Sequence, residues 1–283
     1  MYREHAPTPE LQALVTCTWQ HTAAAEMQAR VVPDACIDIV WRDSRLSVAG
    51  PDTRPVHVEL SPGTQIVGLR FAPGSAATVL GVPASALCDS RVALTELWGD
   101  AARALQDALH AAPDAAAAAR CLERAVLARR MRADEPDPLV PALLGRLRPT
   151  AARFAGAPPA ALPRQLSAAA RSRTQSPSRA AAEPVSLVLP EPPSVAALAR
   201  ALGVSERQLL RRSRAAFGYG PKVLGRILRF QAFRGALRAR PRASLAQLAQ
   251  AFGYADQAHL THEVRELAGV PPSQLKLEAE RQG

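Results

Sequence analysis

The sequence predicts an α+β protein with a β-rich N-terminal domain and an all-α C-terminal domain. Three observations predict this division. Short alternating apolar runs between turn residues fill the first 72 positions, and apolar spacing then becomes helical. An internal repeat with a 50-residue offset occupies the C-terminal third. At 283 residues and 30.1 kDa, the chain is long enough for two domains with cores of their own.

The strand predictions rest on β-branched or alternating residues that end at turn residues. Pro, Gly, Asp and Ser between the runs mark the turns. Several short strands with turn signals between them favour a sandwich or barrel-like arrangement. The predicted strands are Leu14–Trp19, Cys36–Trp41, Ser47–Val48, Val56–Leu60 and Gln65–Phe71.

Helical spacing begins near Ser75. It predicts helices over Ala76–Leu80, Leu94–His110 and Leu139–Leu147, and one more that begins at Pro113 with Asp114 in its first turn. These helices either cover the β-rich part or pair with a second copy of the chain. Residues 1–148 are therefore expected to form a β-rich domain with trailing helices.

Residues 149–192 are rich in Pro, Ala, Ser and Arg and show little periodicity, which predicts a flexible linker. A short strand over Val185–Leu189 is the alternative for one part of it. Charge is uneven on the two sides of this region. Residues 1–137 hold 13 Arg against 17 Asp and Glu, a net charge of −4, and residues 138–283 hold 22 Lys and Arg against 8, a net charge of +14. The asymmetry predicts a polyanionic partner for the C-terminal half.

Composition argues against export and membrane insertion. No run of 18 apolar residues occurs, and the polar N-terminus lacks an apolar signal segment. The four cysteines form no C-x-x-C pair and fit no zinc spacing, so buried free thiols are expected. We expect a cytoplasmic protein without a cofactor or a metal.

The repeat aligns Ser194–Gly203 with Ser244–Gly253 at six identical positions of ten. In each copy Ser begins a helix as its N-cap and Gly ends it. Ser205 and Asp256 then cap a second helix. Two short helices joined by a Gly turn are typical of a helix-turn-helix motif, so we expect residues 193–283 to hold two such motifs.

The second helix of each motif carries polar side chains suited to the edges of bases and to phosphates. They are Arg207, Gln208, Arg211 and Arg212 in the first copy, and Gln257, Thr261, His262 and Arg265 in the second. The segment Pro221–Arg240 between the copies predicts a helix of about 28 Å. This length is close to the ~34 Å of one DNA turn, so the long helix would hold both motifs on one side of a duplex.

Residues 193–277 resemble the DNA-binding domain of the AraC/XylS family of bacterial transcription regulators. The resemblance rests on the segments 253–261, 267–272, 218–222 and 226–230. Segments 32–38, 49–53 and 68–74 resemble, more weakly, the β-rich N-terminal domain of a subgroup of this family. The resemblance implies a regulator that binds promoter DNA, with RNA polymerase, a small-molecule effector and a second copy as further partners.

By this resemblance, the base-reading positions are Arg207 and Arg211 in the first motif, and Gln257, Ala258, Thr261 and His262 in the second. His262 stands where Arg is common and Glu266 where a basic residue is frequent. The second motif is therefore expected to bind more weakly. Ser213 replaces a core Phe of the family, and Phe217 or Leu210 would fill its space.

Candidate effector-pocket residues in the N-terminal domain are Cys36, Asp38, Trp41 and Arg70. Strand alternation places Asp38 and Val40 on one face with Cys36, and Trp41 on the other. The alternative is that Trp41 is core and Asp38 pairs locally. No spacing of nucleophile and base predicts catalysis, and His259 with His262 lacks a third metal ligand nearby. Two other functions stay open: a nucleoid-type DNA binder, and an alkyl-transfer repair protein with a borrowed DNA-binding domain.

Overall fold

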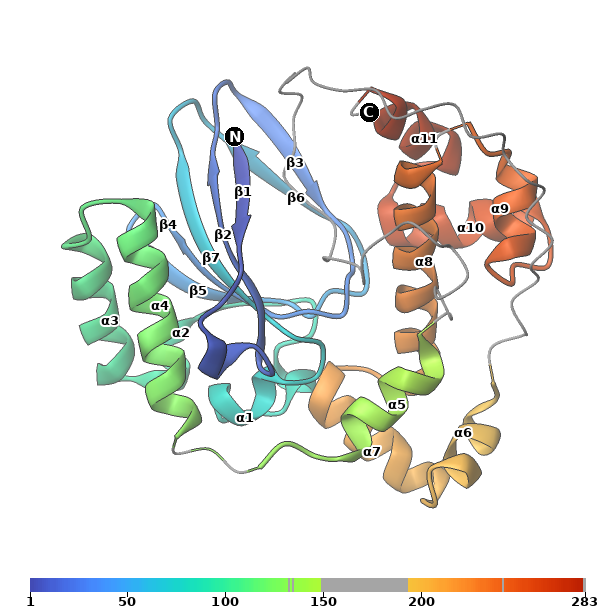
Figure 1. The fold of residues 1–283 in the computed structure, drawn as a ribbon, viewed down its shortest axis with the longest axis horizontal. Coiled ribbons are helices and arrows are strands. Elements are labelled where there is room, and N and C mark those ends of the chain that lie inside the picture. The colour runs from blue at the N-terminus through green and yellow to red at the C-terminus, as the bar shows by residue number, and fades with distance from the viewer. Residues whose placement is uncertain (132, 134, 149–192, 241, 282–283) are drawn as a thin grey trace.

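The computed structural model describes residues 1–131, 133, 135–148, 193–240 and 242–281. A β-rich lobe with helices on its outer side is followed by an all-helical lobe, which ends at the C-terminus (Figure 1). The fold class predicted from the sequence is confirmed. The predicted linker over 149–192, with the alternative strand at Val185–Leu189, lies outside the described residues. The domain boundaries stay a prediction.

Eight strands form the β-rich lobe, and every pair is antiparallel. Six make one sheet in the order β1-β2-β7-β4-β5-β8, and β3 pairs with β6 in a separate ribbon. The strands of the large sheet are β1 (Tyr2–His5), β2 (Val15–Thr22), β7 (Gln65–Phe71), β4 (Asp38–Arg42), β5 (Arg45–Ala49) and β8 (Arg91–Ala93). The ribbon consists of β3 (Met27–Val31) and β6 (Val56–Leu60).

All five predicted strands exist, and two of them match in both bounds. Strands β1, β3 and β8 were missed. Each is short and carries a charged or polar residue at one or more exposed positions, so its sequence resembles a loop. These three strands are defined by pairing with β2, β6 and β5, which residue-level patterns do not reveal.

Four helices cover one face of the large sheet. They are α1 (Ala76–Leu80), α2 (Leu94–Trp98), α3 (Asp100–His110) and α4 (Ala115–Arg130). Buried Ile39 and Leu69 from the sheet pack with Leu122 of α4 in this core. The single helix expected over Leu94–His110 is divided at Gly99, whose φ of 56° breaks the helix. Helix α4 begins at Ala115 rather than at the expected Pro113, because Asp114 is its N-cap and its side chain accepts a hydrogen bond from Ala117 N.

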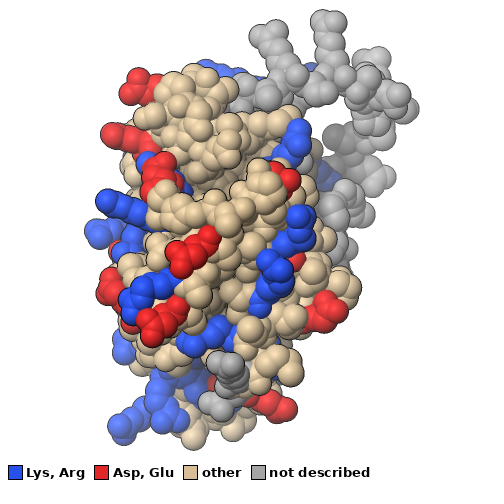
Figure 2. All heavy atoms as spheres, turned by 90° about the vertical axis from the view of Figure 1, so that its left-hand side faces the viewer, with Lys and Arg blue, Asp and Glu red and all other residues tan. Residues whose placement is uncertain are grey.

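The outer face of α3 and α4 carries Arg side chains interspersed with Asp and Glu, without a basic patch (Figure 2). Arg103 and Asp100 of α3, for example, form an exposed ion pair. This surface does not have the charge of a DNA-binding face. Among the described residues, no helix is both long and apolar enough to cross a membrane.

The second lobe is built from seven helices among the described residues. They are α5 (Leu139–Leu147), α6 (Val195–Ala201), α7 (Glu206–Phe217), α8 (Pro221–Ala239), α9 (Leu245–Ala251), α10 (Gln257–Ala268) and α11 (Pro272–Glu280). The central α8 begins with Pro221, where a missing N–H costs nothing. Its length of 19 residues agrees with the predicted connecting helix.

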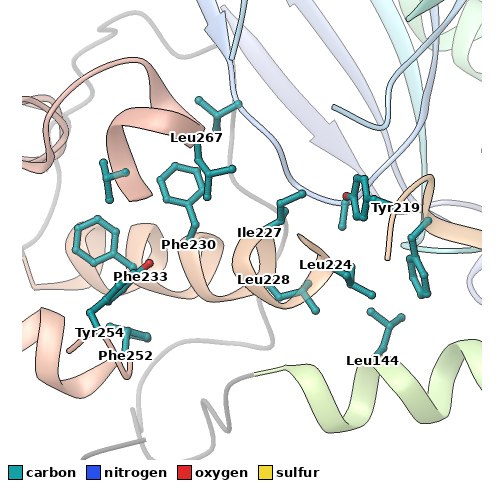
Figure 3. Close-up of a cluster of buried hydrophobic side chains, with 14 of the residues drawn as sticks. Leu144, Tyr219, Leu224, Ile227, Leu228, Phe230, Phe233, Phe252, Tyr254 and Leu267 are labelled. Atoms are coloured by element: carbon teal, nitrogen blue, oxygen red, sulfur yellow. The ribbon is translucent and has the colours of Figure 1, made fainter. Parts of the chain in front are cut away.

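Side chains of α8 hold this lobe together. Phe230 and Phe233 are fully buried, and Phe233 meets Phe252 edge to face with ring centroids 6.4 Å apart. At the other end of α8, Leu224 lies near Leu144 of α5 and near Tyr219 (Figure 3). One rigid helix therefore carries the elements that precede it and those that follow it.

The two lobes share a buried core. Val32 and Ala35, from the loop after β3, are 2% and 3% exposed and belong to the cluster around α8. A Cβ at Gly218, at the end of α7, would lie 2.6 Å from Cγ of Pro51 in the β-rich lobe. Helix α7 also packs on the short helix Ala84–Ala86. Both lobes thus form one packed unit.

Candidate nucleic-acid interface

The first helix-turn-helix unit consists of α6 and α7. Ser194 caps α6 by accepting from Ala197 N at 3.2 Å. Gly203 turns the chain with a φ of +67°, a conformation that favours glycine. Ser205 then caps α7 in a capping box, because it accepts from Gln208 N while Gln208 Oε1 accepts from Ser205 N. The caps fix where α7 begins and therefore which side chains it exposes.

Arg207 and Arg211 lie exposed on α7, one helical turn apart. Gln208 is exposed, but its carbonyl oxygen is used in the cap. Arg212 is directed elsewhere: it forms a two-point contact with Asp137, just before α5, with Nε donating to Oδ2 at 2.7 Å. The structure thus brings Arg207 and Arg211 together on open surface and places Arg212 against the segment that leads into α5.

The second unit repeats this construction with α9 and α10. Ser244 makes a capping box with Gln247, and Asp256 caps α10 by accepting from His259 N at 2.7 Å. Gly253 supplies the turn with a φ of +69°. The two sequence copies therefore fold into two copies of one local structure.

The expected reading residues of α10 lie at its surface. Gln257, Ala258, His262 and Arg265 are exposed, and Thr261 is half-buried with its hydroxyl donating to Gln257 O at 2.8 Å. His262 Nε2 lies 3.3 Å from Oε1 of Glu266. This carboxylate places negative charge beside the reading face, which weakens contact with phosphates.

A buried ion pair attaches α10 to α8. Glu263 accepts from Arg229 Nη2 at 2.7 and 2.9 Å, and from Arg226 Nε at 3.2 Å. The guanidinium of Arg229 also lies over the Tyr254 ring, 4.6 Å from its centroid. The sequence analysis missed this pair. The available signal was Arg229 within the apolar stripe of α8, where a charge requires a buried partner.

Ser213 is fully buried on the inner side of α7, and its hydroxyl donates to Tyr219 O at 2.8 Å. Phe217 is 1% exposed, whereas Leu210 is 37% exposed. The core space is therefore filled by Phe217, the first of the two residues expected there.

The four candidate pocket residues of the β-rich lobe do not lie together. Asp38 and Arg70 line a cavity and form a two-point ion pair, with Nε–Oδ1 of 3.0 Å and Nη2–Oδ2 of 2.8 Å. Cys36 is buried beside Asp34, and its Sγ donates to Asp34 O. Trp41 lies on the opposite face, edge to face with His110 at 4.8 Å, as the strand alternation predicted.

Three of the four thiols, those of Cys17, Cys36 and Cys88, do not have the properties of nucleophiles. Burial raises the pKa of Cys17 to about 12 and that of Cys88 to about 11, and it raises the pKa of Cys36 well above its usual value. A neutral thiol reacts slowly, so these cysteines do not favour alkyl transfer. His259 Nδ1 accepts from Ala255 N, and the described residues contain no group of three side chains placed to hold a metal ion.

Family models match two parts of the chain. A family model described as a helix-turn-helix domain matches residues 198–277, and a domain of unknown function, DUF6597, matches residues 3–93. No curated protein matches. Among solved structures, the crystal structure of an apo ToxT variant from Vibrio cholerae strain SCE256 is similar, with 10% identity and a TM-score of 0.40 over 94% of this chain and 97% of that one. This domain match agrees with the geometry in making residues 198–277 a helix-turn-helix domain, a kind of domain that binds DNA.

Proposed function

We propose that the protein reads specific promoter sequences by placing α7 and α10 in two successive major grooves. The observation that supports this most strongly is the duplicated unit at both ends of α8. Each unit has a capped bracing helix, a Gly turn and a capped second helix with exposed polar residues. A helix of 19 residues measures about 28 Å, near the ~34 Å between successive major grooves on one side of B-DNA.

The exposed residues have chemistry that suits base edges. Arg207 and Arg211 can each donate two hydrogen bonds to O6 and N7 of guanine, and Gln257 can pair with N6 and N7 of adenine. Ala258 offers a methyl contact to thymine. Arg265 suits a phosphate, and so does Gln208 through its free amide nitrogen.

The first unit supplies most of the affinity in this proposal. Arg207 and Arg211 on α7 form no ion pair within the described part of the chain, whereas His262 on α10 lies beside Glu266. Charge-assisted contacts of guanidinium groups to bases and phosphates are stronger than contacts between neutral groups. The second unit then adds length and specificity to the site.

The N-terminal lobe regulates DNA binding in this proposal, through a small-molecule effector, through dimerisation, or through both. The loop after β3 supports such coupling. Val31 lines the cavity, while the next residue, Val32, is buried in the core around α8. The carbonyl of Pro33 accepts from Gln231 Nε2 on α8. A movement of the cavity wall at Val31 would therefore act directly on α8, the helix that carries both reading units.

The experiment that tests the proposed function is a selection of genomic fragments by the full-length protein, at physiological salt with competitor DNA. We expect a few promoter fragments, each with two short motifs about one helical turn apart. Equal recovery of all fragments would support a nucleoid-type binder instead. The retained sites also identify promoters at which contact with RNA polymerase is tested by transcription in vitro.

Coupling between the lobes is tested with Gln231→Leu, which removes the hydrogen bond to Pro33. The matched control is Gln250→Leu, because Gln250 lies exposed on α9. Affinity for a selected fragment should change more than twofold in the first variant and stay constant in the second. Unchanged affinity in both would show that the contact does not transmit the state of the N-terminal lobe.

A further inference from the structure

DNA binding leaves unexplained a cavity of about 900 Å³ in the β-rich lobe. It lies between the large sheet and the β3–β6 ribbon, on the face opposite to α1–α4. Its volume is in the range of small-molecule sites. Apolar side chains supply much of its wall: Trp19, Val40 and Ile66 from the sheet, and Val31, Val56 and Val58 from the ribbon.

We propose that this cavity binds an uncharged, mainly apolar small molecule. This inference rests on the regulatory part of the proposed function, because such a ligand would be the effector. Two properties of the cavity carry it: an apolar floor and an internal balance of charge.

The floor of the cavity is apolar because the indole of Trp19 covers the centre of the sheet. A Cβ at Gly68 would lie 2.2 Å from the Trp19 ring, so the indole lies directly against the backbone of β7. Its Nε1 donates to Asp38 Oδ2 at 3.1 Å and is no longer available to a ligand. Gly68 pairs with Val40, and Val40 with Ser47, which continues this floor across β4 and β5.

The charged groups that line the cavity are already paired inside the protein. Arg70 is held at two points by Asp38, and Arg91 is held at two points by Asp52, at 2.8 and 2.7 Å. Arg42 Nε donates to Asp43 at 2.8 Å.

Only two charged lining groups lack an ion-pair partner among the described residues. Arg45 and Glu59 are both exposed, and their charges are opposite. In the buried part of the cavity, where Asp38 and Arg70 already pair with each other, a charged ligand would find no free counter-ion, and burying its charge there is costly. An uncharged ligand avoids this cost.

The test uses two fluorescent probes that differ by one charged group. N-phenyl-1-naphthylamine is uncharged, and 8-anilino-1-naphthalenesulfonate has the same ring system with a sulfonate. Both are titrated into the full-length protein. We expect saturable 1:1 binding of the uncharged probe, at least tenfold tighter than that of the sulfonate. Equal or tighter binding of the sulfonate, or no saturable binding, would overturn the inference.

The site is located with Val40→Trp, which fills the middle of the floor, and with Ser47→Phe in case the first variant does not fold. The control is Ala101→Trp on the exposed face of α3. The cavity-filling variants should bind the uncharged probe at least tenfold more weakly, and the control variant should bind it unchanged. Full probe binding in a folded cavity-filled variant would place the probe elsewhere and refute the site.

These outcomes are separate from the proposed function, because DNA binding is measured on the same proteins without the probe. Retained promoter selection with failed probe binding would refute the ligand class alone. Failed promoter selection with probe binding at Val40 would refute the regulatory function and leave the site intact.

Discussion

Loss of the Glu263 carboxylate should destabilise the second helix-turn-helix unit more than any other single charge change on α10. Its side chain is 5% exposed and accepts from Arg229, which is 11% exposed. Glu263→Gln keeps the shape and removes the negative charge, so the guanidinium of Arg229 stays buried without a counter-charge. Breaking a buried pair in this way costs about 3–5 kcal/mol. Because a typical domain has about 5–15 kcal/mol of stability, this is a large fraction.

The assay is urea unfolding of the full-length protein, followed by titration of a selected promoter fragment. Glu266→Gln is the matched control on the same helix, since that carboxylate is 48% exposed and its contact with Arg226 is worth about 0–1 kcal/mol. In Glu263→Gln, binding to the half-site read by α10 should fall with stability. Binding to the half-site read by α7 should persist.

A second variant identifies the cause. Replacing both partners, Arg229→Met with Glu263→Leu, removes the orphaned charge and should recover most of the lost stability. A loss below about 1 kcal/mol in Glu263→Gln would refute the view that this pair holds α10 on α8. The same holds if the double variant is as unstable as the single one.

Three further outcomes follow from the structure. Gly68→Ala should destabilise the β-rich lobe by about 1–3 kcal/mol, because its Cβ displaces Trp19. The control is Gly235→Ala in α8, whose Cβ meets nothing within 4 Å and should stabilise the protein by about 1 kcal/mol. The urea midpoints of the two variants test this difference. Arg211→Ala should cost about 1–3 kcal/mol of binding and relax one base position in a repeated selection, whereas an equal loss on all sequences would assign Arg211 to a phosphate. Burial lowers the pKa of His21 below its usual 6.5, so the stability that this neutral side chain contributes above pH 6.5 should be lost as pH falls through the lowered pKa. His21→Leu should remove this part of the pH dependence. An unchanged pH dependence of the urea midpoint in this variant would contradict the prediction.

The helical part of the fold could be predicted because its signals are local. Ser194, Ser205, Ser244 and Asp256 each mark a helix start through a bond within three residues. Gly99 shows the limit of this reasoning, because the apolar spacing continues across it while the backbone does not. The helix caps could be identified in the sequence, but a helix break that leaves the apolar periodicity unchanged could not.

The pocket residues were only half predictable because they depend on distant pairing. Strand alternation correctly separated Asp38 from Trp41, but it does not show that Arg70 lies opposite Asp38 on β7. Nor does it show that β3 and β6 leave the large sheet to form the second wall of a cavity. Similarly, Arg212 resembles a DNA contact in sequence, and only the folded chain brings Asp137 to it.

The central claim, two reading helices in two grooves, is tested most directly by methylation interference on a selected promoter fragment. The account predicts two interference patches in the major groove, about 10 base pairs apart, on one side of the duplex. Arg211→Ala should weaken interference only within the first patch, and Gln257→Ala only within the second. A single continuous patch, or loss of both patches in either variant, would contradict the assignment of α7 and α10 to separate grooves.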